Sequence, residues 1–287
     1  MDAFKSASLP DWVLAVVADK GTERPFSGEY DNFGDSGTYL CRRCGLALFR
    51  SSTKFHSGCG WPSFDEEVEG SVVRQTDADG QRSEILCARC HAHLGHVFSG
   101  EGFTPNNTRH CVNSLSLDFV PNLTVKDTRE AIFAGGCFWG VEALFKKLPG
   151  VLKTEVGYSG GHKKHPTYEE VCAGGTGHYE AVRVVYDSSQ LSDEALMKFF
   201  FEIHHPEQGD GQGPDRGEQY RSVIFFYDDE QKQVAIKLIA ELAKLGIHAT
   251  TQVLPVSTFW PAEKYHQDYY AKTGHAPYCH VYEKKFK

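Results

Sequence analysis

Hydrophobic residues in the second half of the chain recur with two different periods, and the two kinds of segment alternate. The pattern predicts strands over 182–186 and 223–227 and helices over 193–204 and 229–245. Ser192 stands directly before the first of these helices, where its hydroxyl can cap free backbone N–H groups. The alternation predicts an α/β or α+β fold for this half.

The first half has a different pattern, with short apolar runs, many glycines and cysteines, and frequent Ser-Gly and Asp-Gly turn signals. This pattern favours a mainly antiparallel β domain. One amphipathic helix is predicted near the N-terminus, over 12–18. A polar segment over 121–130, which begins with a proline, separates the halves. We therefore predict domains over 1–120 and 131–287 joined by this linker.

Composition narrows the class of protein. A chain of 287 residues with 40% hydrophobic and 24% charged residues is typical of a soluble protein with two domains. A net charge of −8 and the lack of a long basic run argue against nucleic acid as a partner. No stretch approaches the roughly 20 apolar residues of a membrane span, so no membrane is expected. Nine cysteines without a secretion signal indicate a reducing, cytoplasmic setting in which thiols bind metal or react.

Two Cys-x-x-Cys pairs stand in the first half, Cys41 with Cys44 and Cys87 with Cys90. Four thiolates at this spacing predict a closed, tetrahedral zinc site that holds the fold together, with one Zn²⁺ per chain. Because cysteine fills all four positions, no open position remains for substrate. A redox role for either pair is the weaker alternative, since no thioredoxin-like pattern surrounds them.

The segment 135–140 places one thiol, Cys137, between glycines and two aromatic residues, directly before an apolar run with helical spacing. Cys137 is therefore predicted at a helix N-terminus, where the helix dipole favours thiolate over thiol. Phe138 and Trp139 offer an apolar wall for a small apolar group. The alternative is a buried structural cysteine beside core aromatics.

Two further cysteines of the first half lie in different settings. Cationic and hydrogen-bonding residues surround Cys111, a setting that lowers a thiol pKa. Cys59 lies in a glycine-bounded loop that could approach a partner thiol, and Trp61 nearby offers an apolar surface. His93 and His96 follow the second Cys-x-x-Cys pair as acid/base candidates, with metal ligation or core packing as the alternatives.

These motifs together resemble the methionine sulfoxide reductases. Residues 20–120 are similar to the B-type enzymes through the segments 28–30, 57–64, 93–98 and 109–117 and the two Cys-x-x-Cys pairs. Residues 130–280 are similar to the A-type enzymes through the segments 135–140, 166–172, 177–182 and 215–222. The resemblance implies a fusion in which the first domain reduces R-sulfoxide and the second reduces S-sulfoxide. For the second domain it implies an α+β sandwich with a mixed sheet flanked by helices.

The resemblance also assigns roles. In the second domain it implies Cys137 as nucleophile, a neutral Glu180 as acid, and Phe138 and Trp139 around the substrate methyl group. The acid pocket would be completed by Tyr168, Tyr220 and Asp215. In the first domain it implies Cys111 as nucleophile, with Trp61 against the methyl group and the sulfoxide oxygen surrounded by His96, His93 and Asn113. His110 departs from the pattern, because many B-type relatives carry an aromatic residue there.

Attack on a sulfoxide leaves a sulfenic acid, which a second thiol converts to a disulfide for reduction by an external dithiol such as thioredoxin. The resemblance implies Cys59 as the resolving thiol for Cys111 and Cys279 for Cys137, which leaves Cys172 as a structural cysteine. The substrates would be oxidised protein or free methionine sulfoxide, in repair after oxidative stress. A thiol peroxidase or disulfide exchanger is the alternative, but it needs no acid pocket around Glu180. A zinc-stabilised binding module would leave the reactive cysteines without a purpose.

Overall fold

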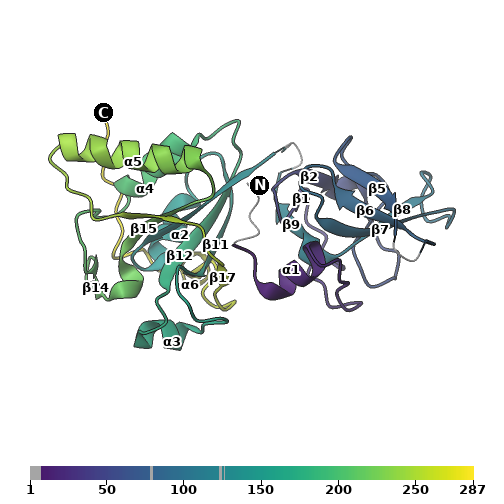
Figure 1. Ribbon diagram of the computed structural model, residues 1–287, viewed down its shortest axis with the longest axis horizontal. Coiled ribbons are helices and arrows are strands. Elements are labelled where there is room, and N and C mark those ends of the chain that lie inside the picture. The colour runs from purple at the N-terminus through teal and green to yellow at the C-terminus, as the bar shows by residue number, and fades with distance from the viewer. Residues whose placement is uncertain (1–7, 78–79, 123–124, 126) are drawn as a thin grey trace. The chain divides into compact units, whose positions relative to one another are not determined.

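A computed structural model describes residues 8–77, 80–122, 125 and 127–287 (Figure 1). The chain forms two compact units, which divide in the sequence between Thr128 and Arg129. The predicted linker 121–130 falls across this point, and three of its positions, 123, 124 and 126, lie outside the described residues. The predicted limits of the two domains stay predictions.

The N-terminal unit is built from short antiparallel strands and one helix. Its elements are α1 (Asp11–Val17), β1 (Thr38–Cys41), β2 (Ala47–Arg50), β3 (Lys54–Phe55), β4 (Ser63–Phe64), β5 (Val72–Thr76), β6 (Ser83–Cys87), β7 (His93–Ser99), β8 (Thr108–Val112) and β9 (Leu117–Val120), with 3-10 turns η2 (Ser51–Thr53) and η3 (Ser114–Ser116). One sheet has the order β2-β1-β9 and the other the order β3-β4-β8-β7-β6-β5. All strand pairs among the described residues of this unit are antiparallel, as the sequence predicted.

The C-terminal unit combines one large sheet with helices. Its elements are β10 (Arg129–Gly135), α2 (Phe138–Phe145), β11 (Val151–Ser159), α3 (Tyr168–Ala173), β12 (Tyr179–Tyr186), α4 (Asp193–Glu202), β13 (Gly211–Gln212), β14 (Asp215–Arg216), η4 (Glu218–Tyr220), β15 (Ser222–Phe226), α5 (Asp229–Lys244), β16 (Gln252–Pro255), β17 (Trp260–Pro261) and α6 (Tyr269–Thr273). The sheet order is β16-β15-β10-β12-β11-β17. Only β15 and β16 pair in parallel among the described strands, so the sheet is mixed, as expected.

The period of a strand explains how the two faces of this sheet are covered. On β10, Ala131 and Phe133 belong to the large core that includes side chains of α2, α4 and α5. Ile132 and Ala134 point to the opposite face, where a smaller cluster includes Phe259 from the segment after β16. Helices α2, α4 and α5 therefore pack on one face of the sheet, and a loop covers part of the other.

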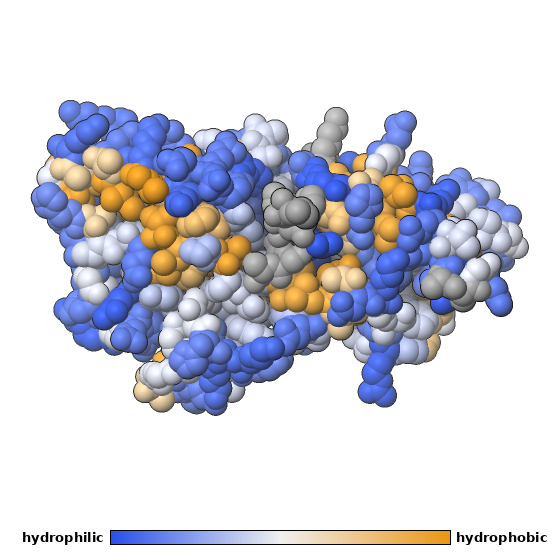
Figure 2. All heavy atoms as spheres, in the orientation of Figure 1, coloured by the Kyte–Doolittle hydropathy of each residue, from blue (hydrophilic) through white to orange (hydrophobic). Residues whose placement is uncertain are grey.

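Most predicted elements of this half are confirmed within a few residues. The predicted strands correspond to β12 and β15, and the predicted helices to α4 and α5. The backbone N–H of Ala195 donates to the Ser192 hydroxyl at 3.2 Å, which confirms the predicted cap. Helix α5 buries Ala235, Leu238 and Leu242, and Figure 2 shows hydrophilic residues along its upper edge with hydrophobic ones below.

Among the helices that the structure describes, none is both long and apolar enough to cross a membrane.

Candidate active sites and metal site

Cys137 lies where β10 turns into α2, and it forms the N-cap of that helix, as predicted. The turn requires a glycine at position 136, which has a φ of +99°. Cys137 is 6% exposed. Strand β12 lies beside β10, and it carries Glu180 to the same end of the sheet. The backbone N–H of Phe138 donates to Glu180 Oε2 at 3.0 Å, so the Glu180 carboxyl contacts the residue directly after Cys137.

Glu180 is almost completely buried, with 1% of its surface exposed. Burial raises the pKa of its carboxyl well above the usual range, and the nearby Cys137 and Asp215 act in the same direction. The hydrogen bond from Phe138 lowers this pKa but does not outweigh burial. The carboxyl is therefore held in its neutral, proton-donating form.

Two phenol groups adjoin this carboxyl. Tyr168 begins α3 and Tyr220 lies in η4, and burial followed by the charge of Glu180 raises the pKa of both hydroxyls. The thiol of Cys172 hydrogen bonds with both tyrosines. Cys172 itself is exposed, and its role as a structural cysteine stays a prediction.

The C-terminal tail brings Cys279 to Cys137. The two thiols are hydrogen bonded, and this bond together with burial raises the pKa of Cys137. The backbone N–H groups of Trp139 and Gly140 lower it, as the helix argument predicted, but they are outweighed. The predicted low pKa of Cys137 is therefore wrong for this arrangement. Asp215 accepts a hydrogen bond at 3.2 Å from the hydroxyl of Tyr278, the residue before Cys279.

The aromatic residues after Cys137 are placed differently from each other. Phe138 is 1% exposed, and its ring stacks on that of Tyr168 with centroids 6.3 Å apart. Trp139 is partly exposed and stacks on Tyr269 with centroids 3.9 Å apart. Its indole N–H donates to His266 Nδ1 at 3.1 Å. Together these rings form an aromatic cluster around the first residues of α2, directly after Cys137 in the sequence.

In the N-terminal unit, a cavity of about 120 Å³ contains most of the residues predicted for the B-type site. It is lined by Thr22, Trp61, Arg82, Gly95, His96, Phe98, Cys111 and Asn113. Cys111 lies on β8 and His96 on the neighbouring β7, directly opposite each other in the register. The sulfur atoms of Cys111 and Cys59 are 3.7 Å apart. The sheet thus assembles a thiol pair, an imidazole and an indole around one small cavity.

The two thiols of this cavity differ in pKa. The hydrogen bond from Cys111 lowers the pKa of Cys59 to about 4. The same bond and burial raise the pKa of Cys111, although the charge of Arg109 lowers it. Sequence analysis predicted the low pKa for Cys111, and in this arrangement that prediction is wrong. The hydroxyl of Ser57, 3.0 Å from the Cys59 sulfur, lowers the pKa of Cys59 further.

The two predicted histidines have different surroundings. His96 lines the cavity, and its Nε2 is 2.8 Å from Asp77 Oδ2. His93 is 3% exposed, its Nδ1 is 2.7 Å from Glu84 Oε1, and burial lowers its pKa. Its ring lies against His96 with centroids 5.6 Å apart. His93 therefore lies behind His96 rather than on the cavity wall.

Asn113 is held in place by backbone groups. Its Oδ1 accepts from the N–H of Glu23 at 3.0 Å, and its Nδ2 donates to the carbonyl of Leu94 at 3.1 Å. His110 is buried, with Nε2 2.9 Å from Glu67 Oε2, and it is not among the residues that line the cavity. The polar character of His110 therefore leaves the cavity wall unchanged.

Sequence reasoning missed several polar residues at the two sites. Arg82 and Thr22 line the B-type cavity, and the Glu23 carbonyl accepts from the Trp61 indole at 3.1 Å. His280 contacts Cys279, with Nδ1 2.9 Å from Sγ. No spacing rule marks these residues, because tertiary packing brings them to the sites. Adjacency to Cys279 was the one available signal for His280.

The four paired cysteines converge at the ends of two hairpins. The sulfur atoms of Cys41, Cys44, Cys87 and Cys90 all lie within 4.8 Å of one another, with 3.6 Å between Cys41 and Cys90. Tetrahedral zinc with bonds of about 2.3 Å separates its sulfur ligands by about 3.8 Å. Each Cys-x-x-Cys pair is followed by a turn residue with a positive φ. Gly45 has a φ of +77°, and His91 has a φ of +54°. The spacing of the four sulfur atoms therefore fits a zinc ion. His91 closes the turn that begins at Cys87.

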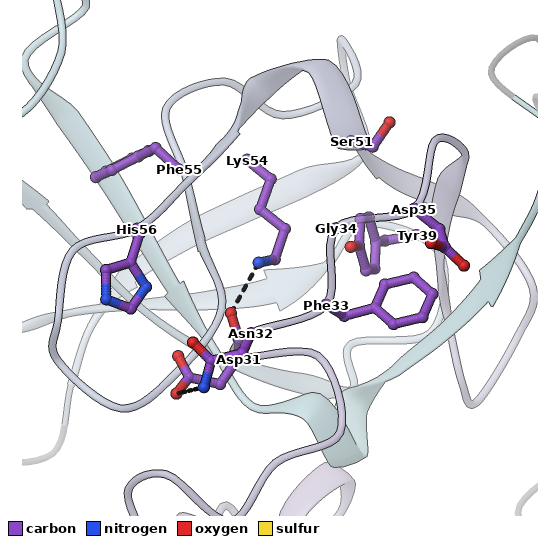
Figure 3. A pocket seen from close by; sticks show the side chains of 10 residues that line it. All are labelled: Asp31, Asn32, Phe33, Gly34, Asp35, Tyr39, Ser51, Lys54, Phe55 and His56. Atoms are coloured by element: carbon purple, nitrogen blue, oxygen red, sulfur yellow. Dashed lines mark hydrogen bonds between the residues drawn. The ribbon is translucent and has the colours of Figure 1, made fainter.

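A second cavity of the N-terminal unit, of about 310 Å³, is shown in Figure 3. Its wall includes Phe33, Tyr39, Lys54 and His56, and Lys54 Nζ donates to the Asp31 carbonyl at 2.8 Å. The predicted site residues are absent from the described lining of this cavity. The candidate chemistry lies at the two thiol pairs.

Each unit thus carries a pair of cysteines in contact, an arrangement typical of thiol-dependent oxidoreductases. The family model for peptide methionine sulfoxide reductase matches residues 129–287, and the SelR domain model matches residues 9–121. The chain belongs to the peptide methionine sulfoxide reductase family, and it joins a SelR domain to that reductase domain. The resemblance recognised in the sequence is confirmed.

Curated relatives and a solved structure support this family assignment. The chain is 51% identical over 150 residues to the peptide methionine sulfoxide reductase MsrA of Nautilia profundicola, covering 52% of this chain and 87% of the relative. It is 53% identical over 150 residues to the MsrA of Thermus thermophilus, covering 52% and 85%. Reduced Mxr1 of Saccharomyces cerevisiae is similar over 54% of this chain and 92% of that one, with 34% identity and a TM-score of 0.52.

Proposed function

We propose that the chain reduces both epimers of methionine sulfoxide, the R form in the N-terminal unit and the S form in the C-terminal unit. The observation that carries this proposal is a pair of contacting thiols in each unit, near the buried Glu180 carboxyl in one unit and opposite His96 in the other. A peroxidase or a disulfide exchanger would use the thiols but has no need for a buried neutral carboxyl. Glu180 therefore favours sulfoxide reduction over this alternative.

In the C-terminal unit, Cys137 attacks the sulfoxide sulfur and Glu180 protonates the oxygen. The raised pKa of Glu180 supports this role, because an ionised carboxylate could not donate a proton. Tyr168 and Tyr220 adjoin this carboxyl and remain protonated, so their hydroxyls can donate to the same oxygen. Trp139 and the ring of Phe138 provide the apolar contact for the methyl group, and Asp215 positions the tail through Tyr278.

In the N-terminal unit, Cys111 attacks and His96, which faces Cys111 across strands β7 and β8, donates the proton. The ring of His93, which is hydrogen bonded to Glu84, packs against His96 and orients it. Asn113 fixes the loop after β8 through its bond to the Leu94 carbonyl. Trp61 receives the methyl group. Because the two sulfur atoms are 3.7 Å apart, Cys59 can take the thiol proton of Cys111 as Cys111 attacks.

Recycling follows the same course in both units. Cys59 attacks the sulfenic acid on Cys111, and Cys279 attacks that on Cys137, so each cycle ends in an intramolecular disulfide. Contact between the thiols of each pair supports this step. A dithiol reductant such as thioredoxin then reopens the disulfides. Free methionine sulfoxide and oxidised protein are the proposed substrates, and repair of oxidised protein in the cytoplasm is the proposed role.

Zinc is proposed at the four paired cysteines. A bound Zn²⁺ would link the β1–β2 turn to the β6–β7 turn and stabilise the N-terminal unit. Arg43 and Arg89 donate to the Cys90 and Cys44 carbonyls and bring positive charge to a cluster of thiolates. The metal supplies a structural link, and the reacting thiols are Cys59 and Cys111.

Assays with each epimer of a peptide methionine sulfoxide test the division of labour. Cys137→Ser should abolish reduction of the S form and keep reduction of the R form, because each nucleophile serves its own unit. Cys111→Ser should do the reverse. Circular dichroism is the control for folding of the substituted unit, because the activity that each variant keeps reports only on the other unit. Loss of both activities from either substitution would contradict the proposal.

A further inference from the structure

His280 lies between the resolving thiol and the backbone of the nucleophile loop. Its Nε2 is 2.7 Å from the carbonyl oxygen of Gly135, and its Nδ1 is 2.9 Å from the sulfur of Cys279. The residue is 3% exposed. Both ring nitrogens are thus occupied by defined partners, and one of them is a reacting atom of the proposed function.

The Gly135 carbonyl decides which nitrogen carries the proton. A carbonyl oxygen only accepts hydrogen bonds, so Nε2 must carry the hydrogen and donate it. In a neutral imidazole the other nitrogen is then without hydrogen and accepts. Nδ1 therefore accepts from the Cys279 thiol. Burial lowers the pKa of His280, which keeps the ring neutral around neutral pH.

The glycines of the 135–140 segment make room for this ring. A Cβ atom on Gly140 would come within 2.3 Å of His280 Nδ1, and one on Gly136 within 3.3 Å of Cε1. The ring of His280 can approach the backbone so closely only because Gly136 and Gly140 have no side chains. The ring is therefore packed against the first turn of α2, and its position relative to Cys279 is fixed by the packing as well as by Gly135.

We propose that His280 is the general base of the recycling step, taking the proton of the Cys279 thiol as Cys279 attacks the sulfenic acid on Cys137. The sulfur–sulfur bond forms, the sulfur–oxygen bond of the sulfenic acid breaks, and the oxygen leaves as water. The proton taken by Nδ1 returns to the leaving oxygen or to solvent. Cys279 is oxidised and the sulfenic sulfur is reduced, so no other oxidant is needed. This inference rests on the proposed function of the C-terminal unit.

Charged and titratable groups around the ring do not replace this base. Asp215 is the charged group that raises the His280 pKa, and it bonds to Tyr278 rather than to Cys279. His204 is buried on α4's C-terminal side, and its Nδ1 and Nε2 are occupied by Phe200 and Ser222. Burial, followed by the charges of Cys137 and Cys279, raises the pKa of the Tyr270 hydroxyl to about 12, so this hydroxyl stays protonated. Among the described side chains that these contacts bring together, His280 is the one that accepts from Cys279.

The test is a single-turnover experiment with methionine-S-sulfoxide on the full chain. His280→Gln is chosen because an amide N–H can still donate to the Gly135 carbonyl, whereas the base beside Cys279 is gone. Methionine release should keep its wild-type rate. Formation of the Cys137–Cys279 disulfide, followed by rapid alkylation and mass spectrometry, should slow about 100-fold near pH 7. His248→Gln, an exposed position on the same unit, is the matched control and should change neither rate.

The pH dependence separates a base from a structural residue. Without a base, attack requires prior ionisation of Cys279, so the deficit should shrink about tenfold per pH unit as the thiolate fraction rises. A deficit that is equal at every pH, or disulfide formation at the wild-type rate, would overturn the inference. If wild-type protein releases methionine but forms no Cys137–Cys279 disulfide, the proposed recycling route fails and the inference with it.

A measurement on wild-type protein covers the case in which His280→Gln does not fold. Nitrogen-15 chemical shifts distinguish a protonated from a bare ring nitrogen. The inference expects hydrogen on Nε2 and none on Nδ1 of His280 in the reduced protein. The opposite tautomer would remove the acceptor from Cys279 and overturn it.

Discussion

At the scale of single residues, Glu180 shows a conflict between catalysis and stability. In its proposed role the carboxyl must be neutral to protonate a sulfoxide, and burial, which leaves 1% of the residue exposed, raises its pKa as that role requires. In an unfolded chain the same carboxyl ionises at about pH 4.3. Ionisation therefore favours the unfolded state from that pH up to the raised folded pKa, and stability falls as the pH rises through this window.

Glu180→Gln should separate the two effects. The amide keeps an acceptor for the Phe138 N–H but has no proton to give, so single-turnover reduction of S-sulfoxide should fall about 10² to 10⁴-fold. The variant should be more stable than wild type, and its advantage should grow from acidic to alkaline pH, since Gln does not titrate. Rapid-quench methionine release and Tm across this pH range measure both.

Glu241→Gln on α5 provides the matched control, because that carboxylate is at the surface near Lys237. It should change neither the rate nor the pH dependence of stability. A variant at position 180 that kept its activity would show that another group donates the proton. A stability difference independent of pH would contradict the buried neutral carboxyl.

The residue scale also shows where sequence reasoning stopped. The sequence marked Cys59 and Cys111 as a candidate pair, and the structure brings their sulfur atoms within 3.7 Å. It could not say which thiol has the lower pKa, because that depends on the contact between the two thiols, on their burial and on the hydroxyl of Ser57. The same holds for Cys137, where a contact from a distant tail outweighs the local helix effect.

At the scale of elements, prediction worked where the determining interactions are local. Helix α4 begins after the Ser192 cap, and the two Cys-x-x-Cys turns follow strands β1 and β6. The strand order was not predictable, because it depends on contacts between distant segments such as β11 with β17. The exposure of Cys172 was likewise not predictable, because it depends on which face of α3 packs against the rest of the unit.

Gly140 tests how α2 and the tail fit together. Alanine is favoured over glycine in a helix by about 1 kcal/mol, so propensity alone predicts that Gly140→Ala stabilises the unit. The methyl group would instead meet His280 Nδ1 at 2.3 Å, and overpacking of this kind costs about 1–3 kcal/mol. We therefore expect a lower Tm and slower formation of the Cys137–Cys279 disulfide, with methionine release retained.

Gly34→Ala is the control, because a Cβ there has no described atom within 4 Å and its φ is not positive. It should leave both Tm and disulfide formation unchanged. A gain in stability for Gly140→Ala would mean that the ring of His280 moves aside at little cost. The fixed position of that ring would then be contradicted.

At the scale of the whole molecule, each compact unit contains its own pair of contacting cysteines and the other residues proposed for its reaction. Cys59 and Cys111 lie in one unit, and Cys137 and Cys279 in the other. The candidate metal cluster belongs to the N-terminal core, where Cys41, Cys87 and Cys90 are buried among apolar side chains. Loss of metal should therefore affect one activity and spare the other.

Removal of zinc is the corresponding prediction. Purified protein should contain about one zinc per chain, and a structural zinc site of this kind contributes about 10–16 kcal/mol of binding energy to folding. Cys87→Ser, or a strong chelator, should unfold the N-terminal unit and abolish R-epimer reduction. Reduction of the S form should persist, because no described ligand of the cluster lies in the C-terminal unit. Metal analysis, circular dichroism and the two epimer assays measure these effects.

Zinc added back to chelated protein is the control, and it should restore R-epimer activity, whereas no metal can rescue Cys87→Ser fully. R-epimer reduction that continues without metal would show that the hairpin turns around Cys41 and Cys87 hold by packing alone. An iron centre in place of zinc would also contradict the prediction, since four thiolates can bind iron. Parallel loss of S-epimer activity would be the more serious result, because it would mean that the C-terminal unit depends on the fold of the N-terminal one.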